Sequence, residues 1–208
     1  PSCKPEDREM YVVEGDSAGG TAKNARNINQ EVLKLSGKIP NALNTSLPKL
    51  LSNQRIQDII ISLGADPKSL DPKKENPTFS CDNLRVSRVI VLSDADPDGS
   101  HINSLLIAFF WRLFPDLILQ GRLYAVDAPL YNALHKGKHY GGHTIAECFA
   151  AMDKDKVPRN IMFRAKGWGE VDAKLLDPMA FAPNTRKLIR ISEESDKTAI
   201  AFYRAFVG

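Results

Sequence analysis

The sequence predicts an α/β fold, a parallel sheet flanked by helices. Two apolar runs of strand type, residues 10–13 and 89–92, each stop at an acidic cluster. The second run is too apolar for a half-exposed strand, and strands buried on both faces are typical of parallel sheets. We therefore expect the two runs to lie inside one sheet.

The first run leads into a strand-to-helix turn. Glu14 ends it, and Gly15 and Asp16 open a stretch of small residues that suits such a turn. The spacing from Gly15 to Gly20 resembles a nucleotide-binding loop, but Thr21 stands where that loop requires Lys. No nucleotide triphosphate site is predicted here.

The second run ends in three acids, Asp94, Asp96 and Asp98. Their spacing matches the start of a calcium-binding EF-hand loop, which needs Glu at its twelfth position. That position is Leu105, and a strand precedes the loop where an EF-hand has a helix. This interpretation is rejected.

The two acidic clusters can meet if their strands are parallel neighbours, because sites in open α/β sheets lie beyond the carboxyl ends of the strands. Crowded carboxylates repel one another, and a hard cation removes that cost. Mg²⁺ is held by few carboxylates together with waters and phosphate oxygens, so Mg²⁺, with Mn²⁺ as a substitute, is the expected cofactor and phosphate the expected chemistry. The alternative is a structural role, with Asp16, Ser17 and Asp98 as helix caps.

Four further elements are expected in the first part of the chain. Helical spacing runs from Pro48 to Leu63 and ends at Gly64 as a C-cap. Residues 65–82 are rich in Pro, Lys, Asp and Asn and predict a surface loop. An apolar core helix over 102–114 and a buried strand over 122–126 follow.

The composition changes at Asn132, which predicts a division into residues 1–131 and a C-terminal α+β tail, residues 132–208. The elements expected in the tail are short strands around residues 136–142, a helix over 144–152, a strand over 185–191 and a helix over 195–206. His135, His139 and His143 recur every four residues, but the intervening glycines argue against a helix that would gather them on a metal.

Composition limits the remaining classes. The chain has 208 residues, of which 43% are hydrophobic, as in a globular protein with a sizeable core. No apolar run approaches the ~20 residues of a membrane span and no signal-peptide pattern opens the chain, so no membrane partner and a cytoplasmic location are expected. The cysteines, Cys3, Cys81 and Cys148, lie too far apart to suggest a disulfide framework or a zinc motif.

The net charge of +3 permits local basic patches beside an acidic metal site. Several basic residues follow the first acidic cluster closely. As contacts for a nucleic-acid backbone we select Lys38 first, then Lys34, Arg26 and Lys166. The alternative for Lys38, Lys34 and Arg26 is a solvated basic face, and Lys166 is the weaker candidate.

Both acidic motifs resemble the two Toprim motifs of type IIA DNA topoisomerases, in particular those of the B subunits of bacterial gyrase and topoisomerase IV. The first motif covers residues 14–20 and the second residues 94–102, with Gly15, Asp16, Ser17, Gly99 and His101 at motif positions. Supporting segments occur in the family's order, at Cys3 and residues 35–41, 60–64, 129–131 and 166–170. The resemblance covers nearly the whole chain.

The resemblance implies roles for matching positions. Glu14 would act as general acid and base at the ribose 3′-oxygen and share one metal with Asp94. Asp94 and Asp96 would hold a second metal position, with Asp98 in support. The implied partners are double-stranded DNA, a tyrosine-bearing A subunit and the ATPase domain of the same protein, so ATP would bind only in that N-terminal region.

The chain opens on Pro1, and no segment resembles the ATPase domain or the domain that bears the cleavage tyrosine. We expect a piece of a longer polypeptide that is inactive alone in strand passage. Three positions depart from the family pattern: Ser36 replaces a basic residue, Pro97 enters the second motif, and Trp168 replaces a Leu.

Two other functions remain open from the sequence. A metal-dependent DNA nuclease of the Toprim type would use the same acids without a tyrosine. A non-catalytic DNA-binding or scaffolding module would not need the acids, so that Asp94→Ala would leave it unaffected. The sequence does not distinguish supercoiling from relaxation or decatenation.

Overall fold

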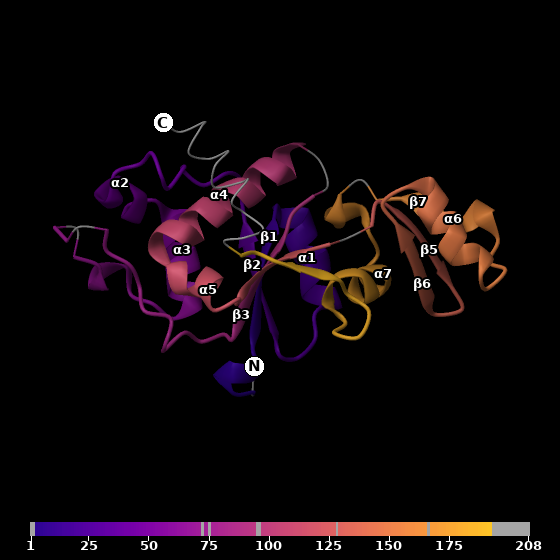
Figure 1. Ribbon diagram of the computed structural model, residues 1–208, viewed down its shortest axis with the longest axis horizontal. Coiled ribbons are helices and arrows are strands. Elements are labelled where there is room, and N and C mark those ends of the chain that lie inside the picture. The colour runs from indigo at the N-terminus through magenta and orange to yellow at the C-terminus, as the bar shows by residue number, and fades with distance from the viewer. Residues whose placement is uncertain are drawn as a thin grey trace.

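The predicted sheet is present, and four of its five strands are parallel. The computed structural model describes residues 3–71, 73–74, 76–94, 97–127, 129–165 and 167–192. Strands pair in the order β2-β1-β3-β4-β8, and only β8 is antiparallel to its neighbour (Figure 1). Their bounds are β1 Glu9–Glu14, β2 Gln30–Leu35, β3 Arg88–Leu92, β4 Leu123–Val126 and β8 Leu188–Arg190. The predicted α/β fold is confirmed.

Helices cover both faces of this sheet, as expected for strands that are apolar on both sides. Met10 and Val12 of β1 belong to one core cluster, while Tyr11 and Val13 belong to another. The first cluster includes residues of α2 to α5, and the second residues of α1 and α7. The helices are α1 Asp16–Ala25, α2 Leu47–Leu51, α3 Gln54–Leu63, α4 Pro97–Leu113, α5 Pro115–Leu119, α6 Ile145–Asp153 and α7 Ala173–Leu176.

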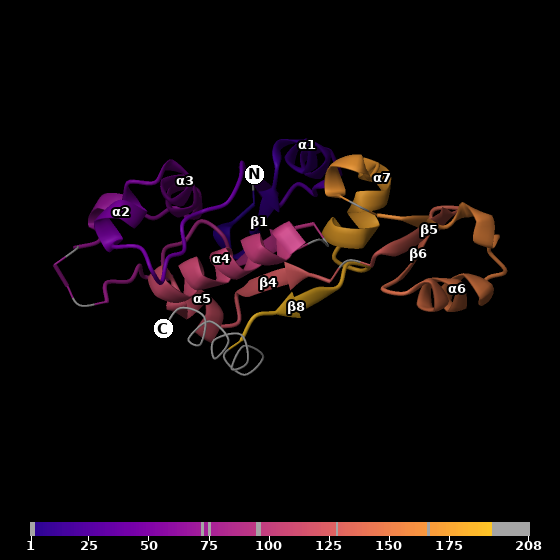
Figure 2. The same cartoon turned by 90° about the horizontal axis from the view of Figure 1, so that it is seen from above.

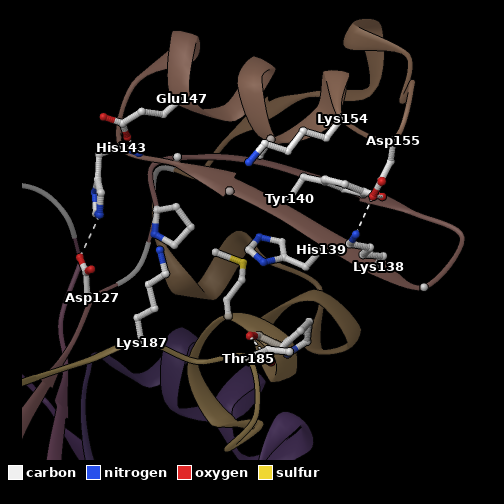
Figure 3. Close-up of a pocket in the computed structure, with 17 residues that line it drawn as sticks. Asp127, Lys138, His139, Tyr140, His143, Glu147, Lys154, Asp155, Thr185 and Lys187 are labelled. Carbon is white, nitrogen blue, oxygen red and sulfur yellow. Dashed lines mark hydrogen bonds and ion pairs between the residues drawn. The ribbon is translucent and has the colours of Figure 1, made fainter.

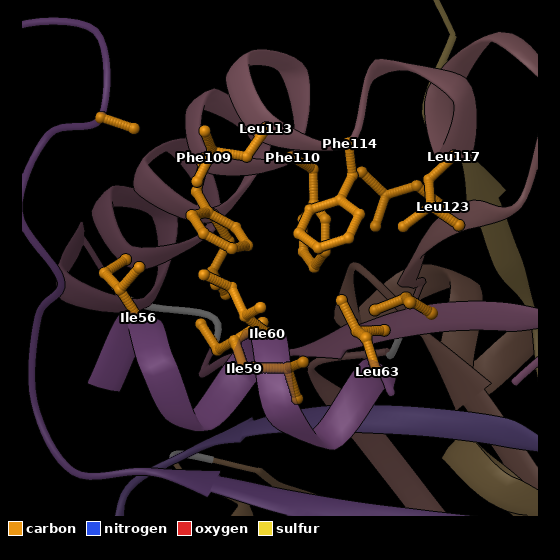
Figure 4. Packing of buried hydrophobic residues seen from close by; sticks show 14 of the residues in the cluster. Ile56, Ile59, Ile60, Leu63, Phe109, Phe110, Leu113, Phe114, Leu117 and Leu123 are labelled. Carbon is orange, nitrogen blue, oxygen red and sulfur yellow. The ribbon is translucent and has the colours of Figure 1, made fainter. Parts of the chain in front are cut away.

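The first core cluster contains side chains of both α3 and α4. Ile56, Ile59, Ile60 and Leu63 of α3 face the aromatic residues of α4 and the segment after it (Figure 4). Phe79 stacks on Phe114 with ring centroids 4.7 Å apart. This packing fixes the helical layer on one face of the sheet.

The predicted helix over 48–63 is wrong in one respect, since it is two helices. The chain breaks at Ser52 and Asn53, and the Asn53 side chain accepts a hydrogen bond from the Ile56 amide at 3.3 Å. Asn is a strong N-cap, which favours a new helix start there over continuation. The predicted C-cap is confirmed, because Gly64 has φ of +90°.

Two other boundaries differ from the prediction. Helix α4 begins at Pro97, five residues before the apolar run, since Pro suits the first turn of a helix. The described residues of the segment 65–82 have little regular structure beyond the turn Pro67–Ser69, but the segment is not only a surface loop. Leu70, Phe79 and Cys81 are buried in the first core cluster.

A second, three-stranded sheet forms a separate lobe at one end of the molecule (Figure 2). Its order is β6-β5-β7, with β5 Tyr131–His135, β6 Lys138–Gly142 and β7 Phe163–Arg164. Lys136 and Gly137 connect β5 to β6 with φ of +49° and +78°, which suits a tight hairpin. Helix α6 begins after Thr144, whose side chain and that of Glu147 form a capping box.

The chain then returns from this lobe to the main sheet. Strand β8 pairs with β4, and α7 continues into a helical turn, Asp177–Phe181, that packs in the second core cluster. The predicted last strand is therefore present but shorter. The division of the chain at residue 131 stays a prediction, and the helix expected over 195–206 lies outside the described residues.

A buried ion pair secures the returning segment. Arg186 donates to both carboxylate oxygens of Glu9 on β1, at 2.5 and 2.6 Å, and both side chains are almost fully buried. Gln30 donates to Glu9 as well, at 2.9 Å. Throughout the part of the chain with described structure, no helix is both long and apolar enough to cross a membrane.

Candidate metal and nucleic-acid site

The two acidic motifs leave the sheet side by side. Strands β1 and β3 are parallel neighbours, with Val13 opposite Leu92. Glu14, the last residue of β1, and Asp94, two residues beyond β3, therefore emerge at the same edge of the sheet. The condition under which the two acidic clusters can meet, that their strands are parallel neighbours, is fulfilled.

The turn after β1 depends on glycine. Gly15 has φ of +79° and stands directly before α1, which begins at Asp16. A side chain at Gly19 would lie 2.2 Å from a carbon of Lys34, so α1 packs closely on the end of β2. Ser17 lies in α1, but its side chain is outside the described structure.

Asp16 pairs with Lys34 near the end of β2 and with Ser36 directly after it. Lys34 Nζ and Ser36 Oγ each lie 3.2 Å from Asp16 Oδ1. The hydrogen bond and charge of Lys34 hold the pKa of Asp16 below its usual value. Asp16 thus links the first motif to the segment that carries Lys38.

The turn after β3 brings α4 against the backbone of Asp94. A side chain at Gly99 would lie 2.1 Å from the Asp94 carbonyl oxygen. Only glycine fits at this position, so the close packing of α4 on Asp94 explains the glycine of the second motif. Asp96 lies outside the described residues, so its predicted metal role stays a prediction.

Lys38 reaches the second motif. Its ammonium group lies 2.8 Å from Asp98 Oδ1, and the hydrogen bond and charge of Lys38 lower the pKa of Asp98. His101, exposed on α4, adds a smaller effect of the same sign. Both partners of the pair are largely exposed, so its net stabilising effect is small.

The other predicted basic residues divide into three cases. Lys34 lies at the same edge, opposite Val13. Arg26 follows α1 and donates to the Gln30 carbonyl at 2.6 Å, about one helix length, roughly 15 Å, from the Gly15 turn. Lys166 lies outside the described residues.

Two neighbours of the site were not predicted from the sequence. Arg55 on α3 donates to the Ser36 carbonyl at 2.5 Å. This contact brings a cation beside Ser36, the position at which the family pattern has a basic residue. Trp168 donates its backbone N–H to Asp94 Oδ1 at 2.9 Å. The sequence singled out the segment 166–170 for Lys166 and for the replacement of a Leu by Trp168, but it did not predict the contact with Asp94.

The donor chemistry at this edge fits a hard divalent cation. Glu14 and Asp94 offer carboxylate oxygens, one oxygen of Glu14 is buried, and a backbone amide orients Asp94. Among residues with described positions, no three His, Cys, Asp or Glu side chains gather into a ready-made metal cluster. Asp98 is paired with Lys38.

A hollow of about 830 Å³ lies between the small lobe and the main sheet (Figure 3). The carboxylates that line it are engaged: Asp127 with His143 at 2.9 Å, Asp155 with Lys138 at 2.5 Å, and Glu147 in the capping box. His135 and His139 lie on opposite strands of the hairpin formed by β5 and β6, so they do not share a helix face. The expectation that the three histidines hold no metal stays a prediction.

His139 gives a pH dependence to stability that can be measured. Burial, with a smaller effect of the Lys187 charge, lowers the pKa of His139 to about 4, and its Nε2 lies 2.8 Å from Asn132 Oδ1. His in the unfolded chain has a pKa near 6.5. The stabilisation of the fold by neutral His139 is therefore complete above that pH and is lost as the pH falls toward 4. We expect the free energy of unfolding, measured in urea, to be lower at pH 5 than at pH 7 by on the order of 2 kcal/mol in wild type. The difference between the two pH values should be smaller in His139→Gln. An equal loss in both proteins would contradict this.

The fold and the paired motifs define a class, and the chain belongs to the Toprim domain family, whose family profile matches residues 9–127. It is similar to the B subunit of DNA gyrase from Thermotoga maritima, 36% identical over 208 residues, which is 100% of this chain and 31% of the relative. It is also similar to the B subunit of DNA topoisomerase 4 from Bartonella bacilliformis, 38% identical over 192 residues, 88% of this chain and 26% of the relative. The chain thus spans less than a third of the length of these two relatives, and the predicted family resemblance is confirmed.

Proposed function

We propose that this chain is the metal-binding part of a type IIA topoisomerase B subunit that supports cleavage and religation of double-stranded DNA by a tyrosine on a partner A subunit. The observation that carries the proposal is the emergence of Glu14 and Asp94 from adjacent parallel strands at one edge, with Lys38 beside them. Similarity to gyrase and topoisomerase 4 B subunits supports the same assignment. Cytoplasmic location follows as part of the proposal.

In this proposal the carboxylates have two roles, metal binding and proton transfer. Glu14 and Asp94, with Asp96 and Asp98, would hold Mg²⁺, and Mn²⁺ would substitute. A bound divalent cation supplies positive charge that stabilises developing negative charge on a phosphate. Glu14, half-buried at the end of β1, would return a proton to the ribose 3′-oxygen when the tyrosine attacks and remove it on religation.

Lys38 would contact the DNA backbone. Its ammonium group is held at the site edge by Asp98 and is about half exposed, so a phosphate can replace the carboxylate as its partner. Lys34 is held in the same way by Asp16. Ion pairs at high exposure exchange partners at little cost.

Lys38→Gln tests this contact. We expect this variant to bind DNA more weakly. The slope of log K against the logarithm of the salt concentration should fall in magnitude by about one unit. The control is Lys68→Gln, an exposed lysine in the turn Pro67–Ser69. Fluorescence anisotropy with a labelled duplex at several salt concentrations measures both. Equal slopes in wild type and Lys38→Gln would exclude the contact.

Plasmid cleavage tests the proposed function. The chain is incubated with supercoiled plasmid and Mg²⁺, alone and with a tyrosine-bearing A subunit. Protein-linked breaks that require the A subunit are the expected result. Breaks made by the chain alone would favour a metal-dependent nuclease, and metal-independent DNA binding without breaks in either mixture would favour a non-catalytic module.

A further inference from the structure

A turn distant in sequence closes over the end of β3. Trp168 belongs to the single turn Trp168–Glu170 and is only 4% exposed. Its backbone N–H donates to Asp94 Oδ1 at 2.9 Å, and its indole Nε1–H donates to the Ser93 carbonyl at 2.7 Å. One residue therefore binds the side chain of Asp94 and the backbone just before it.

This two-point contact restricts the carboxylate. A hydrogen bond from an amide to an ionised carboxylate is charge-assisted and directional, so it selects one side-chain orientation. The indole contact fixes the Ser93 carbonyl, and with it the course of the backbone into Asp94. The indole ring packs in the second core cluster with Val13 and Leu92, so the turn is anchored to the same two strands that carry the site.

Gly167 makes room for this carboxylate. Its φ of −145° is open to any residue, so the backbone does not require glycine there. A Cβ at this position would instead lie 3.1 Å from Asp94 Oδ2. A methyl group would therefore press on the carboxylate itself.

We propose that the Gly167–Trp168 turn is a positioning element for Asp94, so that residues 40 positions beyond the matched Toprim segment, which ends at residue 127, complete the cation site. The inference rests on the proposed function, in that Asp94 is taken as a metal ligand. Outer partners that orient a ligand typically change metal affinity 10- to 100-fold when removed. Trp168 and Gly167 are positioning residues, not ligands.

Cation affinity in matched variants tests the proposal without any DNA reaction. Gly167→Ala presses on the carboxylate, and Trp168→Phe keeps the backbone amide but loses the indole donor. The control is Trp111→Phe, the same change at the other tryptophan, which packs against the first core cluster away from the site. Mn²⁺ binding is titrated by electron paramagnetic resonance, with folding followed by circular dichroism.

We expect Mn²⁺ affinity to fall about 10-fold in Gly167→Ala and Trp168→Phe and to be unchanged in Trp111→Phe. Wild-type affinity in both turn variants would overturn the proposal. If the wild-type chain binds no Mn²⁺, or Asp94→Asn binds it equally well, the proposed function fails first, which separates the two failures.

The fluorescence of Trp168 is a second readout, which does not depend on whether the turn variants fold. In the Trp111→Phe protein the only tryptophan is Trp168, in hydrogen-bond contact with Ser93 and Asp94. Mn²⁺ bound at Asp94 should quench or shift its fluorescence with the same midpoint as the resonance titration. Fluorescence that stays constant while Mn²⁺ binds would overturn the coupling between Trp168 and the site.

Discussion

Arg186→Met should be among the most destabilising single changes in this chain. It removes the buried cationic partner of Glu9, whose side chain is 7% exposed, and leaves this carboxylate with Gln30 and the more exposed Arg88, at 3.5 Å, as its remaining partners. Breaking a buried ion pair from one side costs roughly 3–5 kcal/mol, because the remaining charge keeps its desolvation penalty. Urea denaturation followed by circular dichroism measures the loss.

The double variant Glu9→Met with Arg186→Met is the matched control. Replacing both charges by apolar residues of similar size is often neutral or stabilising. We therefore expect the double variant to recover most of the stability lost in Arg186→Met. If the double variant is as unstable as the single one, the loss arises from packing around residue 186 and not from the Glu9 charge that has lost Arg186.

The pair also has a pH signature. Burial alone would raise the pKa of Glu9, but the hydrogen bonds from Arg186 and Gln30 and the charges of Arg186 and Arg88 outweigh it, so the pKa is lowered. The stabilisation is complete above the unfolded pKa of about 4.3 and is lost as the pH falls through the lower folded value. Without Arg186 the pKa of Glu9 is no longer lowered in this way, so we expect the difference in unfolding free energy between wild type and Arg186→Met to narrow as the pH is lowered.

The strands and acidic motifs of the site could be predicted because their signals are local. An apolar run that stops at Glu14 or at Asp94 marks a strand end within a few residues, and parallel pairing then places both at one edge. The break at Asn53 was missed for a different reason. The apolar spacing continues across it, and the capping signal of one side chain was outweighed.

The contacts between distant segments could not be predicted. Trp168 is 74 residues from Asp94 and meets it through a backbone N–H, which no side-chain pattern reveals. Arg186 and Glu9 are 177 residues apart, and a single sequence gives no reason to pair them. Strand β8 has three residues and an exposed pattern, so its place beside β4 follows only from tertiary packing.

Glu14→Gln should abolish most DNA cleavage in the complex with an A subunit while leaving the fold intact. The change keeps the shape of the side chain at the end of β1 but removes both its charge and its ability to exchange a proton. General acid–base catalysis contributes about 10²- to 10⁴-fold, and we expect the rate of protein-linked break formation to fall within that range. Single-turnover cleavage with the A subunit in excess measures it.

Glu31→Gln is the control for this variant, since Glu31 lies on the neighbouring strand β2 near its start and pairs with Arg85 at 3.3 Å. It should cleave at the wild-type rate. Cleavage by Glu14→Gln within twofold of wild type would exclude Glu14 as the proton-transfer group.

Glu14 is also a proposed metal ligand, so the cleavage rate of Glu14→Gln is measured again over a titration with Mn²⁺. A rate that stays low at saturating Mn²⁺ assigns the loss to proton transfer. A rate restored by Mn²⁺ assigns the loss to metal binding.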